Sequence, residues 1–327
     1  MVEMRRELPL VVVVLAIHRP DQELLQRLLE SLIGQSGVRV MICSVLDDFI
    51  GQHDVAARRK LETAGAEVIL SDGRLGVREA FALGLRRALV TAERHKAMAI
   101  AYADQDDTWH DDKLARSIIR LKEFDAQLVH CDARVITRHG RVIAQSLHRL
   151  ERREFGENLM DRLLLNDVTG MTAVFTPETG ALALRLMDGL KSNVLHDHVT
   201  ALAATALGRI SRYDMPLVDY IQHDNNKIGA GGERRKWWQL GWLLDAGAYN
   251  RHSSSVYEDR RYLLNQLIGQ GIDIGHLAFM FHITGRTGSL RLLQLYGITV
   301  CQYALRGQLR HAHLCIRCLM AACQQSS

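Results

Sequence analysis

The sequence predicts an α/β protein in which a mostly parallel sheet is flanked by helices and followed by a helical C-terminal extension. Strand-like apolar runs alternate with amphipathic segments through the first 130 residues, and this alternation is typical of parallel strands joined by helices. Polar clusters follow the apolar runs, as expected where the carboxyl ends of strands form a ligand site. Beyond Gly229-Ala-Gly-Gly232 the pattern becomes helical to the end of the chain.

In the first part of the chain, each apolar run predicts a buried strand and each amphipathic segment predicts a helix. The strands are expected at Leu10–Ile17, Val38–Val45, Ala66–Leu70, Ala97–Ala103 and Gln127–Cys131. The helices are expected at Asp21–Ile33, Val55–Ala64, Val77–Thr91 and Asp112–Phe124. Leucines from Leu24 to Leu32 have helical spacing, and Gly65 suits the C-cap of the second helix.

The regular alternation is lost after the fifth strand. Arg134–Ile136 and Arg141–Ile143, separated by His139-Gly140, predict a hairpin. The later elements are expected to be strands at Met171–Phe175, Ile210–Tyr213 and Leu217–Ile221 and a helix at His196–Leu207. The pattern as a whole predicts one domain over residues 1–230 and a helical extension over 231–327.

The composition is that of a soluble globular protein, with 47% apolar and 24% charged residues in a chain of 327. The run from Leu8 to Ile17 is too short to span a bilayer and leads into a turn, so a first strand is expected rather than a signal peptide. The net charge of +4 is uneven, because eleven Lys or Arg and five Asp or Glu follow from Glu233 onward. This basic tail predicts an anionic neighbour or, alternatively, solvated helix faces.

Three carboxylates, Asp104, Asp106 and Asp107, follow the fourth predicted strand directly. Asp104 and Asp106 are two residues apart and share one face of an extended chain. Two such carboxylates repel each other unless a cation, or a cation with a phosphate, lies between them. The block therefore predicts a divalent metal and a phosphate-bearing ligand. The alternative is a solvated acidic loop in which Asp111 or Asp112 caps the next helix.

Several short blocks of residues follow one another along the chain in a characteristic order. They are Leu75-Gly-Val77 with Phe81 and Leu85, Ala103-Asp-Gln-Asp-Asp-Thr-Trp109 with Lys113, Leu128-Val-His-Cys-Asp132, Val168-Thr-Gly170, His196-Asp197, and Pro216 with Gln222-His-Asp-Asn-Asn226. Over about residues 8–230 the chain resembles the inverting nucleotide-sugar glycosyltransferases of family two, and more narrowly their bacterial rhamnosyltransferase-like branch. It departs from the family pattern at Ala16-Ile-His-Arg19, where Thr-Tyr-Asn-Arg is common, at Phe49-Ile50, where Gly-Ser is usual, and at His198, where Trp is frequent.

The resemblance implies the GT-A fold, with a Rossmann-like sheet, and metal-dependent sugar transfer with inversion. A divalent metal, Mn²⁺ or Mg²⁺, would stabilise the leaving diphosphate. Asp106 is expected to be the main ligand, assisted by Asp104, with Asp107 orienting them and His223 as a further ligand. Taken alone, His223 also suits a loop histidine bonded to backbone. Asp197 is expected to be the base that deprotonates the acceptor hydroxyl, although by itself it suits an acidic cap in a first helical turn.

The remaining predicted site residues follow the strand ends. Those expected to bind the nucleotide sugar are Ile17, His18, Arg19, Asp47, Asp48, Asp72, Arg78, Asp104 and Gln105. Those expected to contact the acceptor are Trp109, Thr169, Gly170 and His196. Turn formation is the alternative for the Asp47-Asp48 and Thr169-Gly170 pairs. The nucleotide-sugar half is then about residues 1–132 and the acceptor half about 133–230.

The implied partners are a nucleotide-sugar donor and a glycan or lipid-linked glycan acceptor in bacterial surface polysaccharide or lipopolysaccharide synthesis, and no nucleic acid. Cations and tryptophans mix from Arg234 to Leu244, which predicts peripheral contact with the inner face of the cytoplasmic membrane; packing onto the main domain is the alternative. We expect a cytoplasmic protein in which Cys315 and Cys318 are packed, reduced thiols.

Two other function classes stay open. A sugar nucleotidyltransferase would also use an aspartate pair and a metal, but the sequence lacks a Gly-rich, Arg- or Lys-bearing loop after the first strand. A catalytically inactive carbohydrate-binding relative is the second alternative, and the departures near His18 and Phe49 are what favour it.

Overall fold

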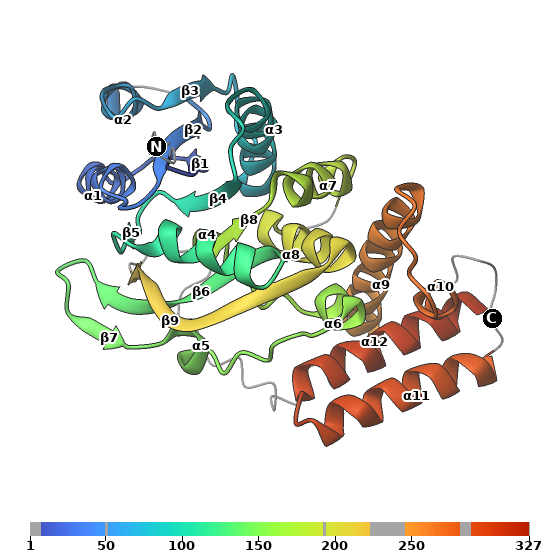
Figure 1. Ribbon diagram of the computed structural model, residues 1–327. Helices are drawn as coiled ribbons and strands as arrows, with labels where there is room; N and C mark the ends of the chain where they lie inside the picture. Colours follow the sequence, from blue (N-terminus) through green and yellow to red (C-terminus); the bar gives the residue numbers. More distant parts are fainter. Residues whose placement is uncertain (1–7, 50–51, 192–193, 223–245, 282–288, 327) are drawn as a thin grey trace, which may run out of the picture. The chain divides into compact units, whose positions relative to one another are not determined.

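The computed structural model describes residues 8–49, 52–191, 194–222, 246–281 and 289–326 (Figure 1). The chain forms two compact units. Unit 1 comprises Met1–Arg152, Val168–Leu184 and Leu195–Ala230, and unit 2 comprises Arg153–Asp167, Arg185–Val194 and Gly231–Ser327. Unit 2 therefore includes two short internal segments as well as the region that the sequence assigns to the C-terminal extension.

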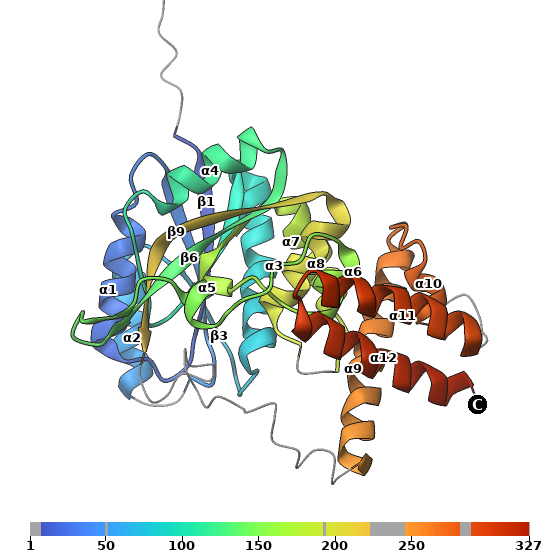
Figure 2. The ribbon, with the colours of Figure 1, turned by 90° about the horizontal axis from the view of Figure 1, so that it is seen from below.

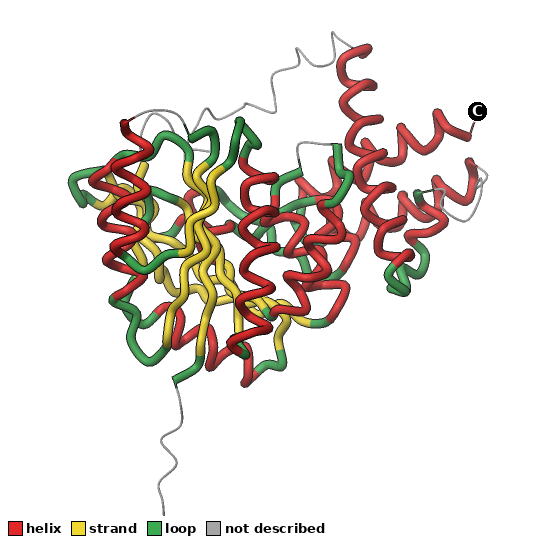
Figure 3. The backbone as a smooth tube through the Cα atoms, turned by 90° about the horizontal axis from the view of Figure 1, so that it is seen from above, coloured by secondary structure: helices red, strands yellow, loops and turns green. Residues whose placement is uncertain are grey.

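Among the described residues, unit 1 is built around a nine-stranded sheet with the order β3-β2-β1-β4-β8-β6-β9-β5, to which β7 is added beside β6. Figure 3 shows its strands running together between helices. The strands are β1 (Leu10–Ile17), β2 (Arg39–Leu46), β3 (Glu67–Leu70), β4 (Ala99–Asp104), β5 (Thr108–Trp109), β6 (Ala126–Thr137), β7 (Val142–Ala144), β8 (Ala173–Phe175) and β9 (Arg209–Gln222). Parallel ladders join β3, β2, β1 and β4, and β6 to β9, while β8, β7 and β5 pair antiparallel. The predicted α/β fold with a mostly parallel sheet is confirmed.

Helices cover both faces of this sheet. Those of unit 1 are α1 (Gln22–Ile33), α2 (Gln52–Thr63), α3 (Val77–His95), α4 (Lys113–Glu123), α5 (Leu147–Leu150), the first part of α7 (Pro177–Met187) and α8 (His196–Leu207). Val13 and Leu15 of β1 belong to one core with leucines of α1 and α4. On the opposite face, Gly84 of α3 lies against Val14. Alternation along β1 thus fills both layers, as a buried parallel strand requires.

Most predicted bounds in the first part of the chain hold within a few residues. β1 and α8 begin and end as predicted. Asp21 caps α1, because its side chain accepts hydrogen bonds from the backbone N–H of Glu23 at 2.9 Å and of Leu24 at 3.2 Å. α3 continues to His95, one turn beyond the prediction, and ends at Lys96, whose φ of 54° is left-handed. The apolar spacing located these helices, whereas their last turns depend on cap geometry.

In two places, two consecutive predicted strands form one continuous strand in the structure. Gln127–Cys131 and Arg134–Ile136 both belong to β6, which continues through the buried Asp132. The Asp132 carboxylate accepts hydrogen bonds from the N–H of Ala133 at 2.7 Å and of His148 at 3.1 Å, so a polar residue is accommodated within the strand. Likewise, β9 runs through Pro216, at the cost of an irregular register against β6. Proline lacks the N–H that a regular ladder needs, which explains the predicted break.

Other elements were not predicted. β5 has only two residues, too few for a periodicity signal. The predicted strand Met171–Phe175 is a 3₁₀ turn, Gly170–Thr172, followed by the short β8. The short helices α5 and α6 (Leu159–Leu164) and the longer α7 were also missed. The helical character of the C-terminal region is confirmed for the residues described there.

Unit 2 consists of α6, α9 (Ala246–Gly269), α10 (Leu277–Met280), α11 (Ser289–Leu305) and α12 (Leu309–Ser326), together with the second internal segment. Arg260 of α9 donates to the carbonyl oxygen of Leu163 at 2.8 Å. The hydroxyl of Tyr303 donates to the buried Asp161 at 2.7 Å. Polar groups of the segment 153–167 therefore find their partners on the C-terminal helices.

The predicted packed thiols are present on α12. Cys315 and Cys318 are buried and unpaired by disulfides, and burial raises the pKa of Cys318 to about 11. No helix in the described part of the chain has both the length and the apolar character needed to cross a membrane.

The close contact of α3 with the sheet gives a first prediction. A Cβ at Gly84 would lie 2.7 Å from Cγ1 of Val14 and 3.3 Å from Cγ2 of Val45. Gly84→Ala is therefore expected to lower the free energy of unfolding by about 1–2 kcal/mol despite its better helix propensity. Gly297→Ala is the control, since Gly297 has open space around it and should gain about 0.5–1 kcal/mol. Chemical denaturation of both variants checks this; equal gains would show that α3 tolerates a side chain there.

Candidate active site

The carboxyl ends of the first four strands are tied to one another by hydrogen bonds. Gln105, after β4, pairs its side-chain amide with the backbone of His18, after β1: it accepts from His18 N at 2.9 Å and donates to His18 O at 3.1 Å. The imidazole Nδ1 of His18 lies 3.2 Å from the carbonyl oxygen of Asp47, after β2. Ser71 N, after β3, donates to Leu46 O at 3.1 Å. The strand ends thus form one continuous edge, as expected for a ligand site.

Asp47 holds the loop that enters α3. Its two carboxylate oxygens accept hydrogen bonds from the backbone N–H of Leu75 at 2.6 Å and of Gly76 at 3.0 Å. The side chain is 5% exposed. Asp47 therefore shapes the edge through the loop 71–76, and its position matches the turn-forming alternative more closely than direct contact with a nucleotide.

The other predicted nucleotide-binding residues are arranged in different ways. Ile17 is buried in the core, so only its backbone reaches the edge. Arg19 and Asp48 both have left-handed backbone conformations, and the Arg19 guanidinium lies 3.9 Å from the Asp48 carboxylate. Asp72 is exposed. Arg78 forms an ion pair with Glu79 at 2.5 Å. Of this group, Arg19, Asp48 and Asp72 leave side-chain surface at the edge.

Asp104 and Asp106 share their surroundings with Asp197 of α8. Burial raises the pKa of the Asp104 carboxyl to about 7, and the charges of Asp106 and then Asp197 act in the same direction. Three carboxylates from two distant parts of the sequence are therefore brought within electrostatic reach of one another.

Asp197 is fixed in the first turn of α8. Its Oδ1 accepts a hydrogen bond from His198 N at 2.7 Å and its Oδ2 from Gly170 N at 3.3 Å. Gly170 must be glycine here, because a Cβ would lie 2.9 Å from Nε2 of His196. Gly170 thus supports Asp197 through its backbone, and the contact of Thr169 and Gly170 with an acceptor stays a prediction.

His196 belongs to an aromatic cluster beneath the carboxylates. Its ring stacks on Phe81 with centroids 3.7 Å apart and meets Tyr102 edge-on at 4.8 Å. The hydroxyl of Tyr102 lies 3.0 Å from that of Thr200. Neither ring nitrogen of His196 has a hydrogen-bond partner among the described residues, and burial lowers the pKa of His196 to about 3. With 4% exposure, His196 supports α8 rather than offering a surface to an acceptor.

Asp107, Trp109 and Lys113 form a buried group behind the acidic loop, by which we mean residues 104–107 at the end of β4. Trp109 is 3% exposed and Asp107 and Lys113 are fully buried. The Lys113 ammonium lies 3.1 Å from the centroid of the Trp109 ring. Burial lowers the pKa of Lys113 to about 7, and burial followed by the charges of Asp106 and Asp104 raises the pKa of Asp107 well above its usual value. The predicted acceptor contact of Trp109 is not supported, because its ring is part of the core.

The acidic loop is also bound to the end of β9. Asp107 accepts a hydrogen bond from Ile221 N at 3.4 Å, and Thr108 and Trp109 pair with Asp219 and Val218. His223 follows directly after this strand in the sequence and lies outside the described residues. The pairing brings the last described residues of β9 beside the block of aspartates.

The donor atoms of Asp104 and Asp106 suit a divalent cation. Hard cations such as Mg²⁺ prefer carboxylate oxygens and often use only one or two from the protein, with water and phosphate oxygens completing the shell. The raised pKa of Asp104 shows that its charged form lacks compensation. Within the described ranges no group of three His, Cys, Asp or Glu gathers closely enough to hold a metal by itself. A cation held by Asp104 and Asp106 would therefore need further oxygen ligands from water or from a bound ligand.

Sequence reasoning missed the residues that position the acidic centre. Tyr102 and Thr200 hold α8 against β4, yet both look like ordinary core residues in the sequence. Phe81 belongs to one of the family blocks but was not predicted to lie at the site. A usable signal was the period of two in β4, which places Tyr102 on the same face as Asp104. The bonds of Asp47 to the loop that enters α3 had no comparable signal, because the partners Leu75 and Gly76 lie 28 and 29 residues away.

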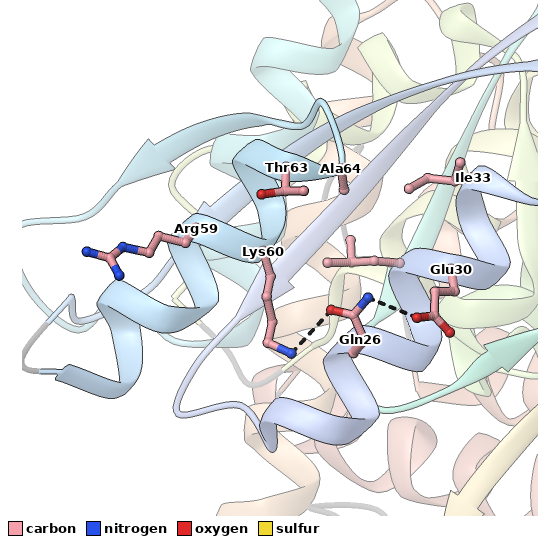
Figure 4. A pocket seen from close by; sticks show the side chains of 8 residues that line it. Gln26, Glu30, Ile33, Arg59, Lys60, Thr63 and Ala64 are labelled. Carbon is pink, nitrogen blue, oxygen red and sulfur yellow. Dashed lines mark hydrogen bonds between the residues drawn. The ribbon is translucent and has the colours of Figure 1, made fainter.

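A groove between α1 and α2 is lined by other residues (Figure 4). Its polar side chains bind one another: Lys60 donates to Gln26 at 3.2 Å, and Gln26 donates to Glu30 at 2.9 Å. The residues that line it are Gln26, Leu29, Glu30, Ile33, Arg59, Lys60, Thr63 and Ala64. None of the predicted site residues contributes to it.

Comparison with known proteins bears on this site. The family model "Glycosyl transferase family 2" matches residues 11–178. No curated protein sequence gives a match. Among solved structures, S. aureus TarS 1–349 in complex with UDP is similar with a TM-score of 0.50 and 14% identity, over 84% of this chain and 69% of that chain.

Two further TarS structures align less closely. The complex of TarS 1–349 with UDP-GlcNAc has a TM-score of 0.49 and 13% identity, over 97% of this chain and 92% of that one. Another S. aureus TarS structure has a TM-score of 0.49 and 12% identity over 83% of this chain, which spans 45% of that protein. At such identities the similarity to TarS concerns the fold.

The position of Asp47 gives a second prediction. Asp47→Asn replaces one acceptor oxygen by an amide donor that faces an N–H of Leu75 or Gly76. We expect the free energy of unfolding to fall by about 1–3 kcal/mol. Hydrogen exchange should become faster at the amides of Leu75 and Gly76. Asp48→Asn is the matched control, because the Asp48 carboxylate lies 3.9 Å from the Arg19 guanidinium rather than against the loop 71–76. Unchanged exchange at Leu75 and Gly76 in Asp47→Asn would contradict the assignment.

The burial of His196 gives a third prediction. The native ring stays neutral down to a pKa of about 3, whereas the unfolded ring takes up a proton below about 6.5. The wild type should therefore lose stability as the pH falls below 6.5, by about 2 kcal/mol between pH 6.5 and pH 5. His196→Phe should lack this part of the pH dependence, and substitution of the exposed His95 should retain it. Denaturant unfolding at pH 7 and pH 5 measures the difference; parallel losses in wild type and His196→Phe would contradict it.

Proposed function

The chain belongs to glycosyl transferase family 2, and we propose that it transfers a sugar from a nucleotide-diphosphate donor to a glycan hydroxyl, in a metal-dependent reaction with inversion. The observation that carries the proposal is the convergence of Asp104 and Asp106, at the end of β4, with Asp197 of α8. One acidic pair would serve the leaving group, and the opposed carboxylate would serve the nucleophile.

On the donor side, Asp106 and Asp104 would hold the cation, and the edge formed by His18, Arg19 and Asp48 would receive the nucleotide. A divalent cation would supply charge stabilisation to the diphosphate as it leaves. The reciprocal bonds between Gln105 and His18 keep the acidic loop in register with β1. The Asp107–Ile221 bond keeps the end of β9 close to the same loop, which supports His223 as an additional ligand.

On the acceptor side, Asp197 would accept the proton of the attacking hydroxyl. The N–H groups of Gly170 and His198 orient its carboxylate, and the dry cluster of His196, Phe81 and Tyr102 supports it from below. A base of this kind typically contributes roughly 10²–10⁴-fold to the rate. Among the described residues we assign one base and no side chain that would attack the sugar itself. This assignment favours a single displacement with inversion.

For the donor sugar we propose rhamnose or another hexose, and for the acceptor a glycan or lipid-linked glycan of bacterial surface polysaccharide or lipopolysaccharide, used at the cytoplasmic face of the membrane. The blocks from Leu75 to Asn226 support this branch of the family. A panel of uridine and thymidine diphosphate sugars that carry rhamnose, glucose, galactose or N-acetylhexosamine would identify the donor. With Mn²⁺ present, the donor that binds the folded state should raise the unfolding midpoint.

The assignment of roles gives a fourth prediction. Asp197→Asn should lower kcat roughly 10²–10⁴-fold while the donor still raises the unfolding midpoint in the presence of Mn²⁺. Asp106→Asn should lose both the transfer activity and the Mn²⁺-dependent part of that shift. Asp111→Asn, which alters an exposed carboxylate in the same loop region, is the matched control and should keep both.

Three outcomes would overturn this function. Transfer at the wild-type rate in Asp106→Asn and Asp197→Asn would remove both residues from catalysis. Release of pyrophosphate from a nucleoside triphosphate with a sugar phosphate would identify a nucleotidyltransferase. Binding of nucleotide sugars without turnover by the wild type, across the panel and with glycan acceptors, would identify a carbohydrate-binding relative.

A further inference from the structure

The turn between α11 and α12 presents two leucines to solvent. We call Leu305, Arg306, Gly307, Gln308 and Leu309 the hairpin tip. Leu305 is 89% exposed, more than any other large apolar side chain in the described part of the chain, where Ile33 follows at 60%. Leu309 is 53% exposed. Figures 1 and 2 both show α11 and α12 lying side by side and joined by this tip. Exposure of this extent on a folded helical hairpin requires an explanation.

The tip is an ordered turn. Gly307 has a left-handed φ of 71°, and Gln308 N donates to Tyr303 O at 2.9 Å. The side chain of Gln308 donates to Phe155 O at 3.0 Å. The exposure of the two leucines is therefore fixed by the backbone of the turn, which ends α11 as a glycine-containing cap.

The apolar surface continues along both helices. Ile298, 59% exposed, and the exposed Cys301 precede Leu305 on α11 at intervals of three and four residues. Ile316 and Met320, 41% and 38% exposed, follow Leu309 on α12 at intervals of seven and four. Each helix thus carries an apolar stripe on a solvent face, at the spacing of one helix surface. The opposite side of α11 is occupied by the buried Tyr296 and Tyr303.

The hairpin formed by α11 and α12 contains arginines and no acidic residue of its own. From Ile274 to Ser327 the sequence contains five arginines and no Asp or Glu. Arg291, Arg306 and Arg310 are exposed, Arg306 in the tip itself, whereas Arg317 is buried and Arg286 lies outside the described residues. The carboxylate of Glu154 does touch the start of α12, but it is engaged there: it accepts from Arg310 N at 3.0 Å and lies 2.9 Å from His311 Nδ1. The tip is consequently an apolar projection in a basic setting.

This combination selects one kind of occupant. A second copy of the chain, docked symmetrically, would bring the same arginines face to face without acidic residues of the hairpin to pair with them. An anionic lipid surface offers an apolar interior for Leu305 and Leu309 and phosphate groups for Arg306. We propose that the hairpin tip inserts into the surface of an anionic membrane. This interaction goes beyond the proposed sugar transfer and does not depend on it.

Sedimentation with lipid vesicles tests the proposal on the full-length chain. The wild type should bind vesicles of phosphatidylcholine mixed with phosphatidylglycerol, and bind phosphatidylcholine alone more weakly. Arg306→Glu reverses one charge and should weaken binding to the anionic vesicles roughly twentyfold. Leu305→Ser/Leu309→Ser should weaken it roughly tenfold or more, because two inserted apolar side chains are lost.

Matched controls are Ile33→Ser, which removes a similarly exposed apolar side chain from α1, and Arg94→Glu, which reverses an exposed charge on α3. Both should bind anionic vesicles as the wild type does. All variants should keep the wild-type unfolding midpoint and the same transfer rate towards a water-soluble acceptor, so the outcome is separate from the test of sugar transfer.

The proposal is overturned by equal binding to both kinds of vesicle, by absence of binding to either, or by tip variants that bind as well as the wild type. It is also overturned if analytical ultracentrifugation shows an oligomer that Leu305→Ser/Leu309→Ser converts to a monomer, since the tip would then be an interface between copies of the chain.

Discussion

The stacking of the His196 ring on Phe81, with Tyr102 against its edge, holds α8 against β4 and α3, and the acidic centre depends on this contact. Asp197 follows His196 directly in the chain, and Asp104 lies two residues after Tyr102. The aromatic contact therefore sets how closely the carboxylates approach. Repulsion among Asp104, Asp106 and Asp197 works against this approach. The close packing of the neutral rings holds α8 and β4 together against that repulsion.

The sequence was most informative where a periodic pattern and a buried surface coincide. β1 could be predicted to the residue, because a run of eight apolar residues that includes four consecutive valines is typical of a short, fully buried strand. α8 was located equally well, although its amphipathic pattern is weak, because the His196-Asp197 block marks its start. By contrast, the continuity of β6 through Asp132 depends on hydrogen bonds from Ala133 and His148 that no local pattern announces.

Some residues of the candidate site could likewise be predicted from the sequence, and others could not. The aspartates at the strand end could be predicted from their spacing, and their proximity to Asp197 follows the family resemblance. The inward roles of Trp109 and Ile17 could not, because motif residues at a strand end are equally compatible with core packing and with ligand contact. Asp47 illustrates the same limit: a carboxylate at this edge can bind a ligand or a neighbouring loop, and only the distances to Leu75 and Gly76 decide between them.

The composition of unit 2 has a consequence for the synthesis of the chain. The segment 153–167 belongs to the same compact unit as residues 231–327, and the buried groups of Asp161 and Leu163 find partners on Tyr303 and Arg260. On the ribosome this segment emerges about a hundred residues before Arg260 and still longer before Tyr303, so it waits without those partners while unit 1 completes its sheet. A nascent chain stalled near residue 245 would therefore carry the segment 153–167 before its partners Arg260 and Tyr303 have been synthesised.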